Sequence, residues 1–527
     1  MTALKNHARR WTQKILNKRH RRSSYPQLEP PSTTAEWGDV AVDMLPDDAL
    51  PMQPISLVQS SAPTADRPDA EIDILPDDAL LEIFDFYLGE TKWTNRWHTL
   101  VHVCRRWRLV IFGSPRHLNL QLVCTHRTPV RRILDVWLPF PIVLKGNYYT
   151  NLGKDNIIAT LEHNDRVCEI ELRHISSSLW ENVLTVMQEP FPILTDLKLL
   201  FADDMASVVP DSFLGGSTPR LRKLVLDGIP FPRLPKLLLS ATHLVHLQLL
   251  NIPHSGYFTP ESMVTCLSTL IRLESLTLKF ESPQPRSDRE NRRRLRIPPP
   301  TRTLLASLTH FTFKGVSEYL EDIVAWVDAP LLDHLDIIFF HQLIFDTPLL
   351  AQFVSRIPKL SAHDQAHVAF SDWGAFLTLP RTYDRQFQLA ISCTQPDWHV
   401  LSMAQVCNST LPLFSTLEHL YISDRGSTQQ RWHDDVENSE WLGLLRPFAA
   451  VKNLYLAEEY APHIVPALKE VVGEWETEVL PALECLFLEK LYKSGPVQVA
   501  IRQLVAMRQL TNRPIAVSLW ERGTKDW

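Results

Sequence analysis

The sequence repeats a short phrase, L-x-x-L-x-L, in which apolar residues occupy the first, fourth and sixth positions. Alternation over the last three positions predicts a short β-strand with one buried side. A chain that repeats such a strand is expected to stack its copies into one continuous core. Nine copies occupy 194–199, 221–226, 244–249, 273–278, 308–313, 332–337, 417–422, 451–456 and 483–488.

The spacing of the phrase predicts the fold class. The central apolar residues at 197, 224, 247, 276, 311 and 335 are 27, 23, 29, 35 and 24 positions apart, which straddles the leucine-rich repeat range of about 20–29. Segments between strands, such as 260–270, show helical spacing of apolar residues. We therefore expect an irregular α/β solenoid with parallel strands on its concave face and helices on its convex face. Between 340 and 415 only weak strands at 367–370 and 386–391 suggest the repeat boundaries.

Composition limits the partners and the compartment. The 527 residues carry a net charge of -6, so no general nucleic-acid partner is expected. No apolar stretch approaches the roughly 20 residues that span a bilayer, so no membrane partner is expected. Seven cysteines are scattered without a C-x-x-C pair, which is typical of a reducing compartment. These features predict a cytoplasmic or nuclear location, or both.

The first 70 residues differ in composition from the rest. Residues 1–22 contain eight Lys or Arg and no acid, which suits either a nuclear import signal or a solvated basic tail. Residues 23–70 are rich in Pro, Ser, Thr and Ala and are expected to be a disordered linker. The octapeptide at 43–50 recurs almost unchanged at 73–80. A silent duplication and a decoy for the same partner are both compatible with it.

Two amphipathic helices are predicted between residues 71 and 115. The first apolar stripe comprises Leu80, Ile83, Phe84, Tyr87 and Leu88, and Pro76 suits the start of its helix. Two helices this short need to bury their apolar faces against each other or against a partner. The second stripe comprises Leu100, Val103, Cys104, Trp107, Val110 and Ile111.

This segment resembles an F-box in three elements that occur in order: Leu75-Pro76, Ile83-Phe84 and Val103-Cys104-Arg105-Arg106-Trp107. With the repeats, the chain resembles the F-box and leucine-rich-repeat proteins that are numerous in fungi. The resemblance implies binding to a Skp-type adaptor and, through it, to a cullin scaffold. It divides the chain into an F-box at 71–115, a connector at 116–164 and a repeat domain at 165–527. The implied adaptor-binding residues are Leu75, Pro76, Leu80, Ile83, Phe84, Val103 and Trp107.

Exposed aromatic residues are expected near the end of the repeat array. In the last three phrases the residue between the two buried positions is Tyr421, Tyr455 or Phe487. Such anchors are typical of target-binding surfaces. The alternative is that a C-terminal segment, 515–520, folds over them as a cap. An arginine-rich insertion at 282–302 is predicted to be a loop, either solvated or able to bind acidic or phosphorylated segments.

Catalytic motifs point away from an enzyme. The sequence contains no Walker phosphate loop, no G-x-S-x-G and no H-E-x-x-H. His363 and His367 could share one helical face, but a metal site needs three or four ligands. We therefore predict no catalytic residues, no metal and no cofactor. The predicted function is that of a substrate receptor of an SCF-type ubiquitin ligase, and the alternative is a repeat scaffold with no role in ubiquitin transfer.

Overall fold

The computed structural model covers the whole chain, and its described residues all follow the predicted tail and linker. The tail and linker at 1–70, the octapeptide at 43–50 and most of the arginine-rich insertion lie outside the described residues. The structure describes 75–89, 97–115, 117–134, 139–147, 153–201, 207–283, 302–361, 363–381, 384–395, 397–409, 414, 416–425, 436–470, 479–490 and 494–521.

Among the described residues, sixteen strands form one sheet in the order β1-β2-β3-β4-β5-β6-β7-β9-β11-β14-β13-β12-β15-β16-β17-β18. All neighbours pair in parallel except β13, which is antiparallel to both β12 and β14. A second, two-stranded sheet pairs β8 with β10. The strands are β1 (Leu122–Cys124), β2 (Ile142–Asn147), β3 (Val167–Ile175), β4 (Asp196–Phe201), β5 (Lys223–Asp227), β6 (His246–Ile252), β7 (Ser275–Phe280), β8 (Thr303–Leu304), β9 (His310–Gly315), β10 (Val327–Asp328), β11 (His334–Phe340), β12 (Gln365–Ser371), β13 (Gly374–Arg381), β14 (Asp384–Ser392), β15 (His419–Asp424), β16 (Asn453–Leu456), β17 (Cys485–Leu488) and β18 (Ala516–Leu519).

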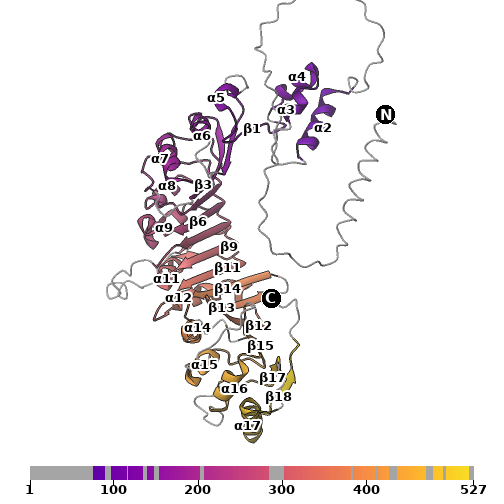
Figure 1. Cartoon of the computed structure of the whole chain (residues 1–527), viewed down its shortest axis with the longest axis vertical. Helices are drawn as coiled ribbons and strands as arrows, with labels where there is room; N and C mark the ends of the chain where they lie inside the picture. Colours follow the sequence, from indigo (N-terminus) through magenta and orange to yellow (C-terminus); the bar gives the residue numbers. More distant parts are fainter. Residues whose placement is uncertain are drawn as a thin grey trace, which may run out of the picture. The chain divides into compact units, whose positions relative to one another are not determined.

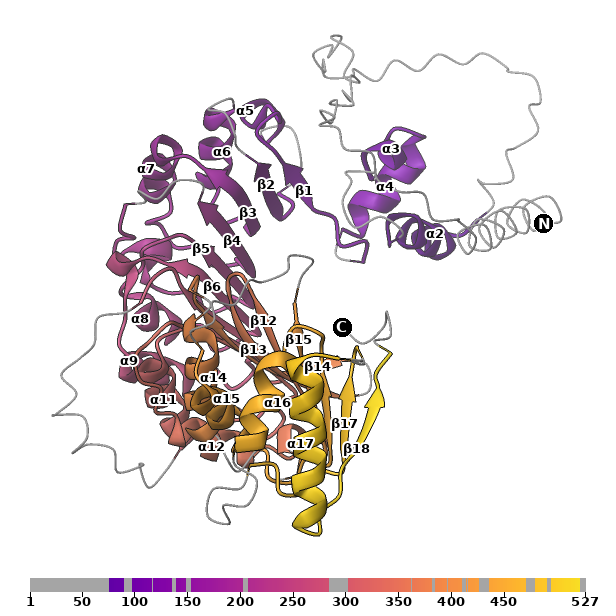
Figure 2. The same cartoon turned by 60° about the horizontal axis from the view of Figure 1, so that its bottom comes forward.

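The helices from α5 to α17 cover one face of this sheet, as Figures 1 and 2 show from two directions. We call the other face the open face. The chain is therefore a mixed α/β protein with a long, mostly parallel sheet, compatible with a leucine-rich-repeat-like solenoid. The helices are α2 (Asp77–Gly89), α3 (Trp97–Val101), α4 (Arg105–Gly113), α5 (Val130–Ile133), α6 (Lys154–Leu161), α7 (Ser177–Val186), α8 (Leu234–Leu238), α9 (Pro260–Leu267), α11 (Ser317–Trp326), α12 (Pro348–Ser355), α13 (Pro358–Ser361), α14 (Asp397–Ser409), α15 (Asn438–Leu445), α16 (Ala461–Glu470) and α17 (Pro496–Leu510).

The repeated phrase forms strands for a simple packing reason. In each of the nine copies the fourth and sixth residues lie in a strand and point into the core, as Leu197 and Leu199 do in β4. The first residue of each phrase precedes the strand and is buried as well, as at Leu194. The residue between the two buried positions lies on the open face. All nine predicted strands are confirmed.

The predicted helix at 260–270 is α9. Thr259 caps it, because its hydroxyl accepts a hydrogen bond from the backbone N–H of Ser262 at 3.3 Å. Pro260 occupies the first turn, where its missing N–H costs nothing. Met263 and Leu267 are fully buried against the sheet. Local sequence signals therefore suffice to place this helix.

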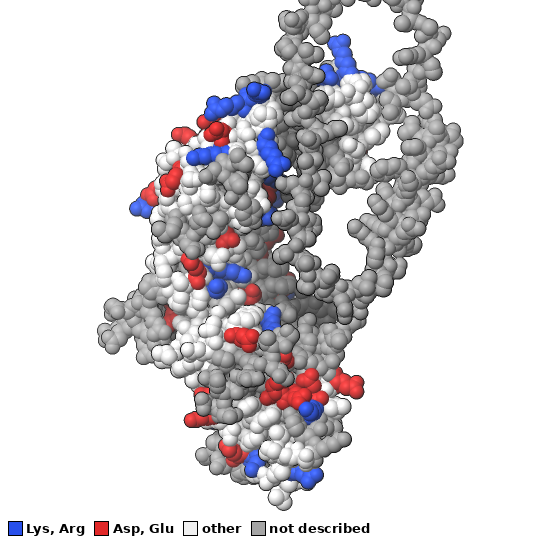
Figure 3. All heavy atoms as spheres, in the orientation of Figure 1, with Lys and Arg blue, Asp and Glu red and all other residues white. Residues whose placement is uncertain are grey.

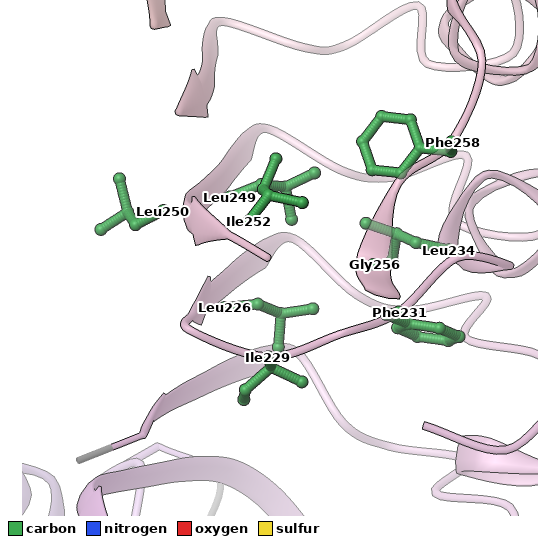
Figure 4. A pocket seen from close by; sticks show the side chains of 9 residues that line it. All are labelled: Leu226, Ile229, Phe231, Leu234, Leu249, Leu250, Ile252, Gly256 and Phe258. Atoms are coloured by element: carbon green, nitrogen blue, oxygen red, sulfur yellow. The ribbon is translucent and has the colours of Figure 1, made fainter. Parts of the chain in front are cut away.

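Neighbouring repeats pack closely enough to leave little free space between them. A cavity of about 10 Å³ lies between the repeats that contain β5 and β6. Figure 4 shows that β5, β6 and the segments that follow them supply its apolar lining. A Cβ atom added at Gly256 would lie 2.9 Å from Pro230 of the preceding repeat, so only glycine fits there without movement. A space of that size and polarity holds neither a small-molecule ligand nor a stable water.

Three expectations need correction. The sheet begins at β1 and β2, which lie inside the stretch 116–164 that we expected to be a connector. β1 pairs in parallel with β2, and β2 pairs in parallel with β3. The strands are not all parallel, since β13 forms an antiparallel hairpin with β12. The second stripe of the helical segment is two helices, α3 and α4, because Cys104 is extended and caps α4.

Within the described residues, no helix combines the length and the apolar character that crossing a membrane requires.

Candidate functional site: an aromatic ladder on the open face

One row of side chains runs along the open face from β2 to β17, each residue in register with the next. The C-terminal end of this row brings together the three predicted aromatic residues. Tyr421 pairs with Tyr455, and Tyr455 pairs with Phe487. The row is Lys145, Glu171, Lys198, Val225, Gln248, Thr277, Thr312, Asp336, Gln388, Thr378, His367, Tyr421, Tyr455 and Phe487.

The aromatic rings of this row stack face to face. The ring centroids of Tyr421 and Tyr455 are 4.2 Å apart with an interplanar angle of 11°, and those of Tyr455 and Phe487 are 4.5 Å apart at 7°. All three side chains are half-buried. Parallel strands about 4.8 Å apart impose this spacing on equivalent side chains. The stack follows from the register of the sheet.

His367 is a fourth ring of the same stack, and sequence reasoning missed its place. It lies on β12 in register with Tyr421, with ring centroids 4.4 Å apart and an angle of 8°. The proposed helical pairing of His363 with His367 is wrong, because His367 lies on a strand and His363 precedes it. The weak strand pattern at 367–370 was the signal that could have found it. We call His367, Tyr421, Tyr455 and Phe487 the aromatic ladder.

The segment 515–520, the alternative expected to cap these rings, forms the last strand of the sheet and does not bury them. β18 pairs in parallel with β17. Trp520 follows it, is 8% exposed, and lies with its ring centroid 5.9 Å from Tyr421 and 5.7 Å from Tyr455. The C-terminal segment thus packs against the aromatic ladder while the ladder's rings stay half-buried.

Carboxylates gather where β15, β16 and β17 end, beside the aromatic ladder. They belong to Asp424, Glu458, Glu459 and Glu489. Figure 3 shows acidic side chains gathered in the lower part of the molecule. Burial and then the charges of the other three carboxylates raise the pKa of Glu459. Lys490 forms an ion pair with Glu458.

The opposite end of the row is charged but balanced. Glu171 on β3 accepts from Lys198 at 3.1 Å and from Arg173 at 2.6 Å. Burial alone would raise the pKa of Glu171, but these two hydrogen bonds outweigh it and lower the pKa. A wide hollow of about 470 Å³ lies next to these residues, and its charged lining comprises Arg127, Lys145, Arg173 and Glu171.

The helical segment is the second candidate site. Leu80 and Phe84, two of the residues implied to contact an adaptor, are 1% exposed. The Phe84 ring meets that of half-buried Trp107 edge to face at 4.8 Å. Arg106 ties α4 to α2 through an ion pair of 2.8 Å with Asp77 and a hydrogen bond to the Leu75 carbonyl. The buried members of the stripe therefore hold the helices together.

Three of the other implied residues lie on the surface of the segment, whereas Leu75 is half-buried. Ile83 is 47% exposed and Val103 is 56% exposed, and Pro76 is exposed as well. Sequence reasoning missed Phe86 and Leu109, which are 71% and 65% exposed. Large apolar residues that fall outside the inward stripe of a short helix were the available signal.

One group among the described residues has the composition of a metal site. Donor atoms of His310, Asp333 and His334 lie within 4.8 Å of one another. The two imidazole rings are parallel, with centroids 4.4 Å apart. The Asp333 carboxylate is already bonded to His334 at 2.8 Å and to Lys359 at 3.2 Å. These contacts hold Asp333 and His334 together without an ion.

The described cysteines are buried or half-buried free thiols. Burial raises the pKa of Cys124 and Cys168 to about 11 and that of Cys266 to about 12. These three thiols stay protonated at neutral pH, and a protonated thiol is a poor nucleophile.

Comparison with solved structures gives several likenesses, among them one to a leucine-rich repeat protein. The crystal structure of the leucine-rich repeat-containing protein LegL7 from Legionella pneumophila is similar over 73% of this chain and 97% of LegL7, with 10% sequence identity and a TM-score of 0.24. No protein-family model matches the chain. No curated protein matches it either.

Proposed function

We propose that this chain is a non-catalytic receptor that joins two proteins, as the substrate-recognition subunit of an SCF-type ubiquitin ligase. The helical segment at 75–115 binds a Skp-type adaptor and, through it, a cullin. The open face binds the target protein. The protein acts in the cytoplasm, the nucleus or both.

One observation carries this proposal: the segment that resembles an F-box keeps large apolar side chains on its surface. Ile83, Phe86, Val103 and Leu109 are each between 47% and 71% exposed. Exposed apolar groups gathered on a short helical segment favour a protein interface. Covering such anchors supplies most of the free energy of a typical interface.

A scaffold without a role in ubiquitin transfer is the second candidate. The aromatic ladder is compatible with it, because a target-binding surface on the sheet needs no adaptor. The two candidates differ only in what the helical segment binds.

Co-purification of the full chain with a Skp-type adaptor tests the proposal. We expect the wild type to retain the adaptor, and Ile83→Ala/Val103→Ala to weaken the complex by about 2 kcal/mol, close to thirtyfold in Kd. Ile271→Ala is the matched control, since Ile271 is 64% exposed but lies in the repeats. Failure of the wild type to bind the adaptor would overturn the ligase proposal and leave the scaffold.

A further inference from the structure

The aromatic ladder ends in a way that leaves room for another group. Each inner ring has a ring on both sides, but Phe487 at the end of the stack faces Ser518 on β18. A serine is too small to cover an aromatic face. A planar or apolar side chain of a partner can therefore continue the stack beyond Phe487.

Ser423 lies two residues after Tyr421 on β15 and is therefore on the same face of the sheet. Ser423 is fully buried, and its hydroxyl has no hydrogen-bond partner among the described residues. A buried hydroxyl without a partner is unfavourable. Along β15 it lies between Tyr421 of the aromatic ladder and the Asp424 carboxylate, and a bound peptide reaches its hydroxyl only when the side chains that cover it move.

The third step is the sign of the charge around the ladder. Strands β15 to β17 and their flanks (416–425, 451–460 and 483–490) contain six acidic residues and three basic ones, a net charge of 3 − 6 = −3. Lys452 and Lys490 are each paired with a glutamate. Arg425 lies over the Phe376 ring at 4.4 Å. The surface beside the ladder therefore favours a cation and disfavours a phosphate.

We propose that the aromatic ladder and the carboxylates beside it bind a basic linear segment of the target protein, in which a lysine or arginine adjoins an aromatic or apolar residue. The proposal rests on the proposed function, because it names the class of target that the open face receives. The apolar residue packs on the end of the stack at Phe487. The basic residue reaches the carboxylates of Glu459 and Glu489, whose mutual repulsion it relieves.

Fluorescence anisotropy on the full chain tests this with two labelled nonapeptides. In the first peptide, arginine and tryptophan alternate in the centre and glycines flank them. In the second peptide, every arginine is replaced by glutamate. We expect the basic peptide to bind at least tenfold more tightly than the acidic one. Raising the salt concentration from 0.05 to 0.5 M should lower the affinity for the basic peptide by about tenfold, because salt screens exposed charge pairs.

Variants locate the site. Tyr455→Ala removes the middle of the stack and should weaken binding of the basic peptide at least tenfold, and Phe487→Leu should weaken it severalfold while preserving apolar volume. Glu489→Gln should weaken it about threefold. Glu281→Gln is the matched control, because Glu281 follows β7 as Glu489 follows β17, each with its N–H bonded to the preceding strand at 3.0 Å. It should leave binding unchanged.

The outcomes separate this inference from the proposed function. Three outcomes would overturn the inference. They are equal binding of the two peptides, no binding of the basic peptide, and wild-type affinity for the basic peptide in both the Phe487→Leu and the Glu489→Gln variants. Each variant is also assayed for adaptor binding, which depends on the helical segment alone. Adaptor retention without peptide binding leaves the ligase proposal standing, and peptide binding without adaptor retention leaves a scaffold for basic segments.

Discussion

The two ends of the open-face row use the same geometry for different chemistry. At β2 to β4 the row reads Lys145, Glu171 and Lys198, and opposite charges lie side by side. At β15 to β17 it reads Tyr421, Tyr455 and Phe487, and rings stack. A parallel sheet in register places equivalent side chains about 4.8 Å apart at either end. The first end pairs its charges with one another, whereas the second combines stacked rings with a surplus of carboxylates.

The largest loss of stability should come from substitutions in the core, where the two ends of the open-face row are alike. Leu199 in β4 and Leu456 in β16 are both fully buried beneath the row. We expect Leu199→Ala and Leu456→Ala each to lower the free energy of unfolding by about 2–5 kcal/mol. Urea unfolding followed by circular dichroism measures both. A much larger loss at one end than at the other would show that the two ends also differ below the open face.

Breaking the aromatic ladder should have the next largest effect. Tyr455→Ala removes two stacking contacts worth about 0.5–1.5 kcal/mol each, so unfolding should become easier by about 1–3 kcal/mol. Because stacking involves no net charge, this loss should be the same in 0.05 and 0.5 M salt. Gln248→Ala, at the equivalent position on β6, serves as the control and should cost less than about 0.5 kcal/mol. A strongly salt-dependent loss would contradict the stacking account.

Local pattern was enough for the nine strands that carry the repeated phrase and insufficient for the other strands and for the site. Each L-x-x-L-x-L phrase predicts its strand because a strand buries its alternating apolar residues on one side. Leu194, Leu197 and Leu199 are an example, since all three are buried. The hairpin β12–β13 was missed because its tight turn at 372–373 and the strand after it carry no such phrase. At Gly374 an added Cβ would lie 2.3 Å from the Ile391 carbonyl oxygen, so the partner strand, absent from any local pattern, dictates the residue.

The same limit explains the aromatic ladder. The three rings at 421, 455 and 487 were predicted because each sits in a countable phrase. His367 joins them only through the register of β12 with β15. Trp520 reaches them only because the chain returns as β18. Contacts across 50 residues or more are set by tertiary packing, which spacing along the sequence does not encode.

The balanced end should respond to acid. Hydrogen bonds from Arg173 and Lys198 lower the pKa of Glu171 in spite of its burial. A carboxyl with a lowered folded-state pKa stabilises the fold above its unfolded pKa, near 4.3, and loses that contribution as the pH falls through the lower folded value. We expect Glu171→Gln to cost about 1 kcal/mol at pH 7 and almost nothing near pH 2, as measured by urea unfolding at each pH. Equal losses at both pH values would show that Glu171 acts through packing alone.

The smallest effect should have the opposite sign and fall at the aromatic end. Burial and the neighbouring carboxylates raise the pKa of Glu459, so its charged form is disfavoured in the folded protein. Such a group weakens the fold once the pH rises above its unfolded pKa and has no effect below it. Because Glu459 is only half-buried, Glu459→Gln should stabilise the protein at pH 7 by less than about 1 kcal/mol, and the gain should vanish near pH 3. Unfolding of both variants across this pH range compares the two ends directly. Relative to the wild type, Glu171→Gln should lose stability as the pH rises, and Glu459→Gln should gain it. A basic peptide bound at the aromatic ladder should abolish the gain, because its cation then stabilises the Glu459 carboxylate that the substitution removes.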